Sequence, residues 1–280
     1  MSSSVFGQDY AFKVMANKGS NEVKSGDSWI PLKTGASLKS TDELKLVDNA
    51  YIGLIHASGK PLEVRQSGSY KVADLAAKVG GGSSVINKYT DFILSSNAET
   101  KKNKLSATGA VHRATETAAI KVALPEKYAD VYNTTAVVNW DGGKALGPYV
   151  VVVKNAFDEQ LAKFETPEST ITIDLSDAKL AAEVVLLVEV SSKNNPKQIS
   201  KQHMIKKMSG ADKEKVKVSL ANISGEVSEP TALNKFILAG FYEENNLLID
   251  AIVAYEEAVK LEPSYRESYD EFLLRHGLKK

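Results

Sequence analysis

The chain has 280 residues, of which 43% are hydrophobic and 25% charged, a composition typical of folded globular proteins with room for two or three domains. Its 35 basic residues balance 35 acidic ones, so the overall charge gives no field that would attract nucleic acid or an anionic membrane. There is no cysteine, which excludes disulfides, thiolate catalysis and zinc sites built on sulfur, and no apolar run is long enough to cross a bilayer.

The first residues contain a candidate export signal. Val5 and Gly7 precede Gln8 at the spacing that a signal peptidase accepts, within the small-residue segment 2–7. The charged start and the apolar core of a complete signal are missing. We therefore interpret the segment either as the remnant of a truncated signal, which predicts a periplasmic location, or as a frayed terminus.

The next part of the chain is predicted to be a compact all-β module. Short apolar segments alternate with turns rich in Gly, Asp, Asn and Ser, and several keep the period of two that is typical of half-buried strands. The predicted strands cover residues 10–15, 29–32, 43–46, 51–56, 62–65 and 69–72. Such short segments leave no room for an active site.

The order of these segments resembles the FecR-like domain. Residues 23–46 read VKSGDSWIPLKTGASLKSTDELKL and residues 50–64 read AYIGLIHASGKPLEV, which follows the family's Trp-x-Pro-Leu strand, its Lys-x-Gly-x-x-Leu turn and its Thr-Asp-Glu-Leu strand. The resemblance implies a periplasmic, sensory or binding, non-enzymatic domain. Signalling members of the family also carry a membrane helix and a cytoplasmic anti-sigma segment. This sequence has neither, so the resemblance does not extend to transcriptional signalling.

Two helices are predicted next, over residues 71–79 and 84–94, because apolar residues recur there at helical spacing. We interpret Gly80–Gly82 between them as a hinge rather than a phosphate-binding loop, because the Gly-Lys-Ser/Thr order of a P-loop is missing. These elements complete a first predicted domain over residues 10–97. The polar, basic residues 98–117 are predicted to be a linker or loop, either flexible or packed as a strand.

Residues 118–209 are predicted to form a β-sandwich. Apolar strands at the spacing of a sandwich cover residues 120–124, 135–140, 148–153, 169–174 and 184–190. The set is similar to an immunoglobulin-like or fibronectin type III sandwich, with Trp140 as its core tryptophan. The similarity implies a domain that spaces or binds.

Residues 210–280 are predicted to form a helical domain. A charged helix over 211–224 precedes a segment that resembles a tetratricopeptide (TPR) repeat. The motif's small, aromatic and proline positions correspond to Leu238, Ala239, Tyr242, Ala251, Tyr255, Ala258 and Pro263. Lys235 occupies the position where the motif favours Trp. Because one repeat cannot bury both of its faces, the helix before it and a helix over 265–275 should pack on it.

The sequence contains no recognisable catalytic, cofactor-binding or metal-binding constellation. None of the four histidines belongs to a zinc motif, and they are far apart: His56, His112, His203 and His276. The Gly-x-Ser-x-Gly turn of a serine nucleophile is also missing. We therefore predict no catalytic residue, no cofactor and no metal.

The sequence thus predicts a multidomain α+β protein that works by binding. We expect a non-enzymatic periplasmic scaffold of the bacterial cell envelope whose partners are proteins, within a secretion or envelope-spanning assembly. The groove of the helical domain would hold the partner, with Asn234, Lys235, Tyr242 and Asn246 on its polar face.

Two alternatives stay open at this point. The FecR-like domain could bind glycan, peptidoglycan or a small ligand through exposed Trp29 and Tyr51, although Trp29 is interpreted first as a core or half-core tryptophan. An enzyme with dispersed carboxylates, such as a glycosidase, is the alternative from another class. Short strands followed by a terminal helical repeat do not suggest a glycosidase architecture.

Overall fold

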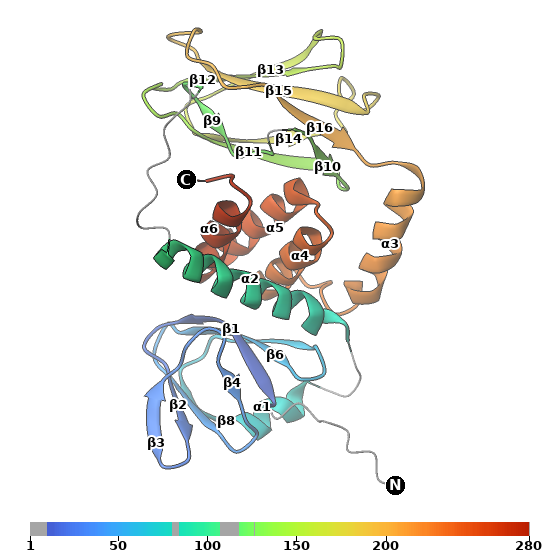
Figure 1. Ribbon diagram of the computed structural model, residues 1–280. Helices are drawn as coiled ribbons and strands as arrows, with labels where there is room; N and C mark the ends of the chain where they lie inside the picture. The colour runs from blue at the N-terminus through green and yellow to red at the C-terminus, as the bar shows by residue number, and fades with distance from the viewer. Residues whose placement is uncertain (1–9, 80–83, 107–117, 126, 280) are drawn as a thin grey trace. The chain divides into compact units, whose positions relative to one another are not determined.

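The computed structural model describes residues 10–79, 84–106, 118–125 and 127–279. This part of the chain is a mixed α+β protein with four sheets and six α-helices, and most of the helices lie in its C-terminal part (Figure 1). The predicted α+β class is confirmed at this level. The candidate export remnant at residues 2–7 and the predicted hinge at Gly80–Gly82 lie outside the described residues.

The chain divides into two compact units, each assembled from segments that are far apart in the sequence. The first comprises Met1–Ser96, Ser219–Gly240 and Glu257–Arg266. The second comprises Asn97–Val218, Phe241–Glu256 and Glu267–Lys280. Each unit therefore combines a β-rich segment with parts of the C-terminal helices. The predicted domain limits, 10–97, 98–117, 118–209 and 210–280, remain predictions.

Eight short strands form two antiparallel sheets in the first unit. One has the order β4-β1-β6-β7, with β4 (Ser37–Leu38), β1 (Phe12–Lys18), β6 (Tyr51–His56) and β7 (Pro61–Val64). The other has the order β3-β2-β5-β8, with β3 (Ser28–Pro31), β2 (Glu22–Ser25), β5 (Glu43–Leu46) and β8 (Gly68–Lys71). All the strands predicted for this segment occur, β5 and β6 with the predicted bounds and the other four shifted, and β2 and β4 are additional.

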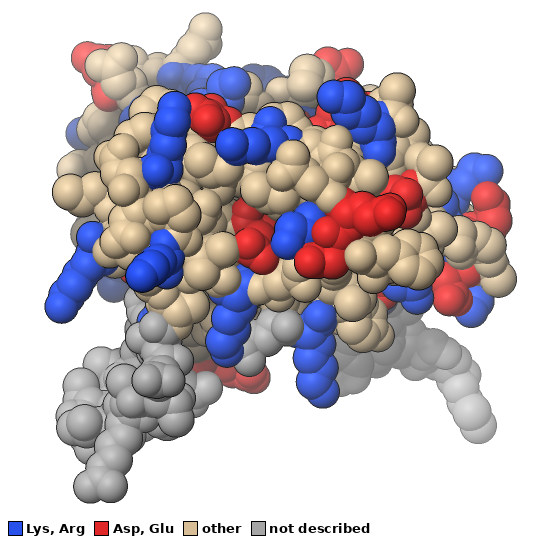
Figure 2. Space-filling view, turned by 90° about the horizontal axis from the view of Figure 1, so that it is seen from above, with Lys and Arg blue, Asp and Glu red and all other residues tan. Residues whose placement is uncertain are grey.

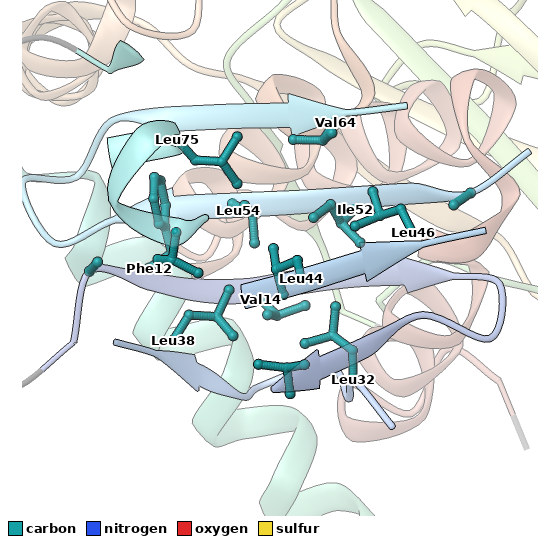
Figure 3. Close-up of a cluster of buried hydrophobic side chains, with 14 residues drawn as sticks. Phe12, Val14, Leu32, Leu38, Leu44, Leu46, Ile52, Leu54, Val64 and Leu75 are labelled. Atoms are coloured by element: carbon teal, nitrogen blue, oxygen red, sulfur yellow. The ribbon is translucent and has the colours of Figure 1, made fainter. Parts of the chain in front are cut away.

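The core of the first unit is a cluster of aliphatic and aromatic side chains contributed by both sheets (Figure 3). Its fully buried members include Phe12, Val14, Leu44, Ile52 and Leu54. Strand β6 is buried along Tyr51–Ile55 without alternation, so both of its faces are covered. A Cβ added at Gly53 would lie 2.5 Å from the Tyr265 hydroxyl oxygen, which shows how closely the second face of β6 is packed.

Two helices follow in the chain, α1 (Val72–Lys78) and α2 (Ile86–Ser106). Helix α2 is longer than the predicted helix 84–94 and continues through the first residues of the predicted linker. Its last turns contain Ala, Glu, Lys and Leu, which favour helix, and no Gly or Pro that would end it. The rest of the predicted linker, residues 107–117, lies outside the described residues.

Eight further strands form a five-stranded and a three-stranded sheet in the second unit. The five-stranded sheet has the order β10-β16-β15-β12-β13, with β10 (Ala129–Val131), β16 (His203–Lys207), β15 (Val185–Ser192), β12 (Tyr149–Lys154) and β13 (Gln160–Thr166). The three-stranded sheet has the order β14-β11-β9, with β14 (Thr170–Asp174), β11 (Thr135–Asp141) and β9 (Lys121–Val122). All the strands predicted for this segment occur, and β10, β13 and β16 are additional.

The core of the second unit is built from alternate residues of these strands. In β12 and β15 the inward set, which includes Val151, Val153, Leu186 and Val188, is 0% exposed. Trp140 is 5% exposed and meets Tyr149 edge to face, with the ring centroids 5.3 Å apart. The prediction that Trp140 lies in a core is confirmed.

The C-terminal helices are α3 (Gly210–Ser224), α4 (Ala232–Glu244), α5 (Leu248–Leu261) and α6 (Arg266–Arg275), with a short 3-10 helix η1 (Pro263–Tyr265) before α6. The small and aromatic residues of the TPR-like register are buried, as close helix packing requires: Ala239, Ala251, Tyr255 and Ala258 are 0% exposed and Tyr242 is 6% exposed. None of the described helices combines the length and the apolar composition that crossing a bilayer requires.

Candidate functional site

Two of the helical residues predicted to contact a partner are buried within the chain. Asn234 is 4% exposed, and its side-chain amide donates to the backbone oxygen of Glu229 at 3.0 Å. Tyr242 is 6% exposed, and its hydroxyl accepts a hydrogen bond from the Asn133 side chain at 3.0 Å. Both polar groups therefore serve contacts inside their own unit.

The other two helical residues also have structural partners. The ammonium group of half-buried Lys235 lies 2.6 Å from a carboxylate oxygen of Glu257. Asn246 is exposed with a φ of 56°, and it ends α4 in a Schellman motif. Its N–H donates to Glu243 O at 2.9 Å, and the next N–H, of Leu247, donates to Tyr242 O at 2.8 Å. The residues predicted for the polar face of a groove thus do not form one exposed surface.

The two aromatic residues proposed for glycan contact also differ from expectation. Trp29 is 39% exposed on β3, so it does not lie in a core. Tyr51 is 1% exposed, and its hydroxyl lies 2.8 Å from the Tyr265 hydroxyl and donates to Glu63 at 2.9 Å. Burial raises the pKa of Tyr51 well above its ordinary value, and the neighbouring hydroxyl of Tyr265 adds to the shift. Tyr51 therefore belongs to the interior.

Trp29 stands in a polar row across the sheet of the first unit. The strand register places it opposite Lys24, which is opposite Glu43, which in turn is opposite Lys71. Neighbours in register share a face, and these side chains are half-buried or exposed. The outer face of this sheet thus carries a charged row with the Trp29 ring at its edge.

The outer face of the five-stranded sheet in the second unit is unusually apolar. Val150, Val152, Val185 and Leu187 point away from the core and are half-buried, and Met204 is 37% exposed. Leu187 lies between Lys154 and Met204 in register, and Val152 lies between Lys163 and Glu189. Viewed onto this unit, the surface shows uncharged areas interrupted by separate lysines and by acidic side chains (Figure 2).

The sequence itself contains a signal for this apolar face, beyond the positions of the strands. The runs Val150–Val153 and Val184–Val188 are continuously apolar. Such runs are typical of strands covered on both faces, whereas an antiparallel strand with one solvated face alternates apolar and polar residues. The composition of this face is therefore typical of a surface that is buried against another molecule or segment.

A group of charged side chains in the helices of the second unit is already paired internally. Glu243 accepts two hydrogen bonds from the Arg275 guanidinium at 2.5 and 2.7 Å, one from Tyr255 at 3.2 Å, and its carboxylate lies 2.8 Å from His276 Nε2. Burial acts to raise the pKa of Glu243, but the donors from His276 and Arg275 outweigh it and hold the pKa below its ordinary value. A carboxylate with all these donors is a structural anchor rather than a base.

Asp250 forms a second buried anchor, at the start of α5. Its two carboxylate oxygens accept hydrogen bonds from the backbone N–H groups of Tyr132 and Asn133, each at 2.8 Å. Burial raises its pKa to about 6, and the backbone donors only partly oppose that shift. The contact fixes the helix to the turn between β10 and β11 and presents no free carboxylate to a ligand.

No described group offers the chemistry of a metal centre, because no three His, Asp or Glu side chains of the described residues gather closely enough to hold an ion. Comparison of the chain with models of protein families and with curated proteins gave no match. The functional argument therefore depends on the geometry of the surfaces described above.

Proposed function

We propose that this chain is a non-enzymatic binding or scaffold protein of the bacterial cell envelope. It works in the periplasm by contacting protein partners, within an assembly such as a secretion or envelope-spanning machine. The observation that carries this proposal is the apolar outer face of the five-stranded sheet, formed by Val150, Val152, Val185, Leu187 and Met204. Exposed apolar side chains grouped on one sheet face can mark a protein interface.

Charges of both signs lie across and beside this face. Lys154 lies 3.8 Å from Glu189, between Val152 and Leu187, and Glu165 lies 2.5 Å from Lys193 and 4.0 Å from Lys163. A partner could pair with these side chains next to the apolar ones, which gives orientation more than affinity because exposed ion pairs contribute little. The arrangement fits a folded protein surface better than a nucleic acid, which would require an excess of positive charge.

In this proposal the β segment of the first unit is a FecR-like domain, the sheets of the second unit are an immunoglobulin-like or fibronectin-like sandwich, and α4 and α5 form a TPR-type repeat. The buried positions of Trp140, Ala239, Ala251 and Tyr255 support these assignments. Because Asn234 and Tyr242 are used inside the chain, the proposed contact surface is the sheet face and not the helical groove.

The test is cross-linking of the full chain in an envelope fraction, comparing the native protein with Leu187→Glu and Ala178→Glu. Leu187→Glu places a charge in the apolar face next to Lys154, which can pair with it and preserve the strand. Ala178 is exposed in the turn after β14 and serves as the matched control. We expect defined protein adducts with the native chain and with Ala178→Glu, and their loss with Leu187→Glu. Equal adducts with both variants, or no envelope adduct with the native chain, would refute the proposal.

Glycan binding by the first unit is a second candidate because one observation favours it. Trp29 exposes an aromatic ring beside Lys24 and Glu43, and a sugar ring can stack on an aromatic face while charged neighbours accept and donate hydrogen bonds. Co-sedimentation with purified peptidoglycan tests it. Trp29→Ala should abolish the sedimented fraction, and Ile30→Ala, at an exposed neighbour, should not. Native chain that stays in the supernatant would remove this candidate.

A further inference from the structure

The eight edge strands of the four sheets differ in how well they are protected against pairing with another chain. Short length, Pro, Gly and Lys are the usual protections of an edge. Strands β4, β9 and β10 have two or three residues, β3 and β7 contain Pro31 and Pro61, β8 contains Gly68 and Lys71, and β13 contains Lys163. Strand β14, with the sequence Thr-Ile-Thr-Ile-Asp, has five residues and none of these protections.

The hydrogen bonds beside β14 show which of its backbone groups point outward. Leu175 N donates to Thr134 O at 2.7 Å, and Trp140 N donates to Ser169 O at 3.0 Å. Antiparallel pairs alternate between bonded and non-bonded, so Ile171 and Ile173 also bond to β11. The N–H and C=O groups of Thr170, Thr172 and Asp174 therefore point away from β11.

The side chains of these outward-pointing residues are also accessible. Thr170, Thr172 and Asp174 are exposed, whereas Ile173 is 1% exposed in the core. Among the described residues, the backbone of Thr170 and of Thr172 takes part in no turn or side-chain hydrogen bond beyond the ladder, and the Asp174 carbonyl accepts one from Asp177 at 3.2 Å. The outer edge of β14 thus offers a short, nearly complete row of unused donors and acceptors.

We propose that β14 pairs with β14 of a second copy of this chain, antiparallel and centred on Thr172, so that two three-stranded sheets become one continuous sheet. The sequence of the strand is self-complementary in this register. Thr172 faces its own copy, Thr170 faces Asp174, and Ile171 faces Ile173. Each pairing is favourable: hydroxyl with hydroxyl, hydroxyl with carboxylate and aliphatic with aliphatic.

Two further features favour a second copy as the occupant. A two-fold axis through Thr172 makes every contact occur twice and closes the assembly at a dimer, and it brings no two like charges directly opposite each other. The chain has a formal net charge of zero at pH 7, so two copies do not repel at long range. The inference goes beyond the proposed function, because it concerns self-association and uses a different surface from the apolar sheet face.

Sedimentation velocity of the full chain over a wide concentration series tests the proposal. As concentration increases, we expect the sedimenting mass of the native chain to rise from that of one chain towards that of two. Thr172→Val should show the same rise, because it keeps the backbone N–H and favours a strand. Thr172→Pro removes the outward-pointing N–H of residue 172 without removing a hydrogen bond to β11. Thr172→Lys places two lysine charges, one from each copy, opposite each other at the two-fold axis. Each should weaken dimerisation by at least about tenfold.

A second measurement on the same samples follows the Thr172 region by hydrogen exchange, which should slow in the native chain as concentration rises. The lysine variant keeps the test decisive if the proline variant fails to fold. A native chain that stays monomeric throughout, or a dimer that persists unchanged in both the proline and the lysine variants, would overturn the proposal. Loss of dimerisation without loss of envelope adducts would leave the proposed function standing.

Discussion

Asp250 shows how the environment of one residue makes stability depend on pH. Its carboxylate is buried, and its pKa is raised from an ordinary 3.8 to about 6. The folded protein therefore holds the proton more tightly than the unfolded chain does. As pH rises through this range, ionisation costs the folded state free energy, and the cost is complete above the folded-state pKa.

We predict that Asp250→Asn removes this pH dependence. Between pH 4 and 7 the unfolding free energy of the native chain should fall relative to that of the variant by about 2–3 kcal/mol. The variant itself loses one acceptor for the N–H groups of Tyr132 and Asn133, so its own stability is lower by about 1–3 kcal/mol at pH 4. Urea unfolding at both pH values measures the difference, with Asp27→Asn in an exposed turn as control. A difference that is the same at both pH values would contradict the assigned pKa.

Gly53 gives a steric prediction at the same scale. A methyl group there would meet the Tyr265 hydroxyl at 2.5 Å and the Tyr51 hydroxyl at 3.2 Å. We expect Gly53→Ala to lower the unfolding free energy by about 1–3 kcal/mol. Gly225→Ala, where nothing lies within 4 Å of the added carbon, should change it by less than about 0.5 kcal/mol.

A double substitution separates the clash from other effects of the methyl group. Tyr265→Phe removes the closest atom, so Gly53→Ala should cost less in its presence than in the native chain. Thermal unfolding of the four combinations gives the coupling. Strict additivity of the two changes would show that the methyl group is accommodated in another way.

The same residues show what sequence could and could not predict at this scale. Trp140 was placed in a core correctly, because it ends an apolar run that only a two-layered β structure buries. Tyr51 was expected to be exposed, but it is buried against Tyr265, which is separated from it by most of the chain. Trp29 is interpreted from the sequence as a core or half-core residue, but it lies on the edge strand β3, and the local pattern Trp-Ile-Pro-Leu does not reveal an edge position.

At the scale of elements, the turn between α4 and α5 depends on a left-handed residue. Asn246 has a φ of 56°, and asparagine tolerates this conformation better than other side chains except glycine. We predict that Asn246→Ala lowers the unfolding free energy by about 1 kcal/mol, while Asn246→Gly leaves it equal or higher. Thermal unfolding by circular dichroism measures both variants. A glycine variant that is less stable than the alanine variant would rule out this role.

The elements also show where the local propensity of residues for strand or helix was enough to predict the structure and where it was not. The central strands β6, β11, β12 and β15 are rich in apolar and β-branched residues, β5 alternates charged residues with leucine, and the sequence predicts all five. Strands β2, β10 and β16 have few apolar residues and exist because neighbouring strands supply hydrogen-bond partners, which no local pattern encodes. Helix α2 extends beyond the predicted helix 84–94 because its polar C-terminal part consists of charged helix formers, which continue a helix well.

At the scale of the whole molecule, the interleaving of segments predicts the effect of truncation. The C-terminal helices supply Ser219–Gly240 and Glu257–Arg266 to the first unit and Phe241–Glu256 and Glu267–Lys280 to the second. A chain ended after Ser209 should therefore lose stability in both units rather than shed one domain cleanly. Hydrogen exchange should show lost protection in β6 and in β11, because both units lose the helical segments that complete them.

The control for this truncation is removal of Lys279 and Lys280 alone, since Lys279 contacts only the last turns of α6 and the turn after it, through a bond from its N–H to Leu273 O at 3.2 Å and an ion pair with Asp270. This shorter deletion should leave protection unchanged. Full protection of β6 in the chain ended after Ser209 would mean that the first unit needs no helical segment and folds as an independent β domain.

The interleaving also sets an order of events during synthesis. Strand β6 leaves the ribosome early, but Leu233 and Tyr265, which pack near Gly53, follow roughly 180 to 210 residues later. At about 5–20 residues per second, that gap corresponds to roughly 10–40 s in which the strand has no partner for its second face. The nascent chain therefore stays incomplete until translation is almost finished, and a cell that moves unfolded chains across a membrane has that interval in which to capture it.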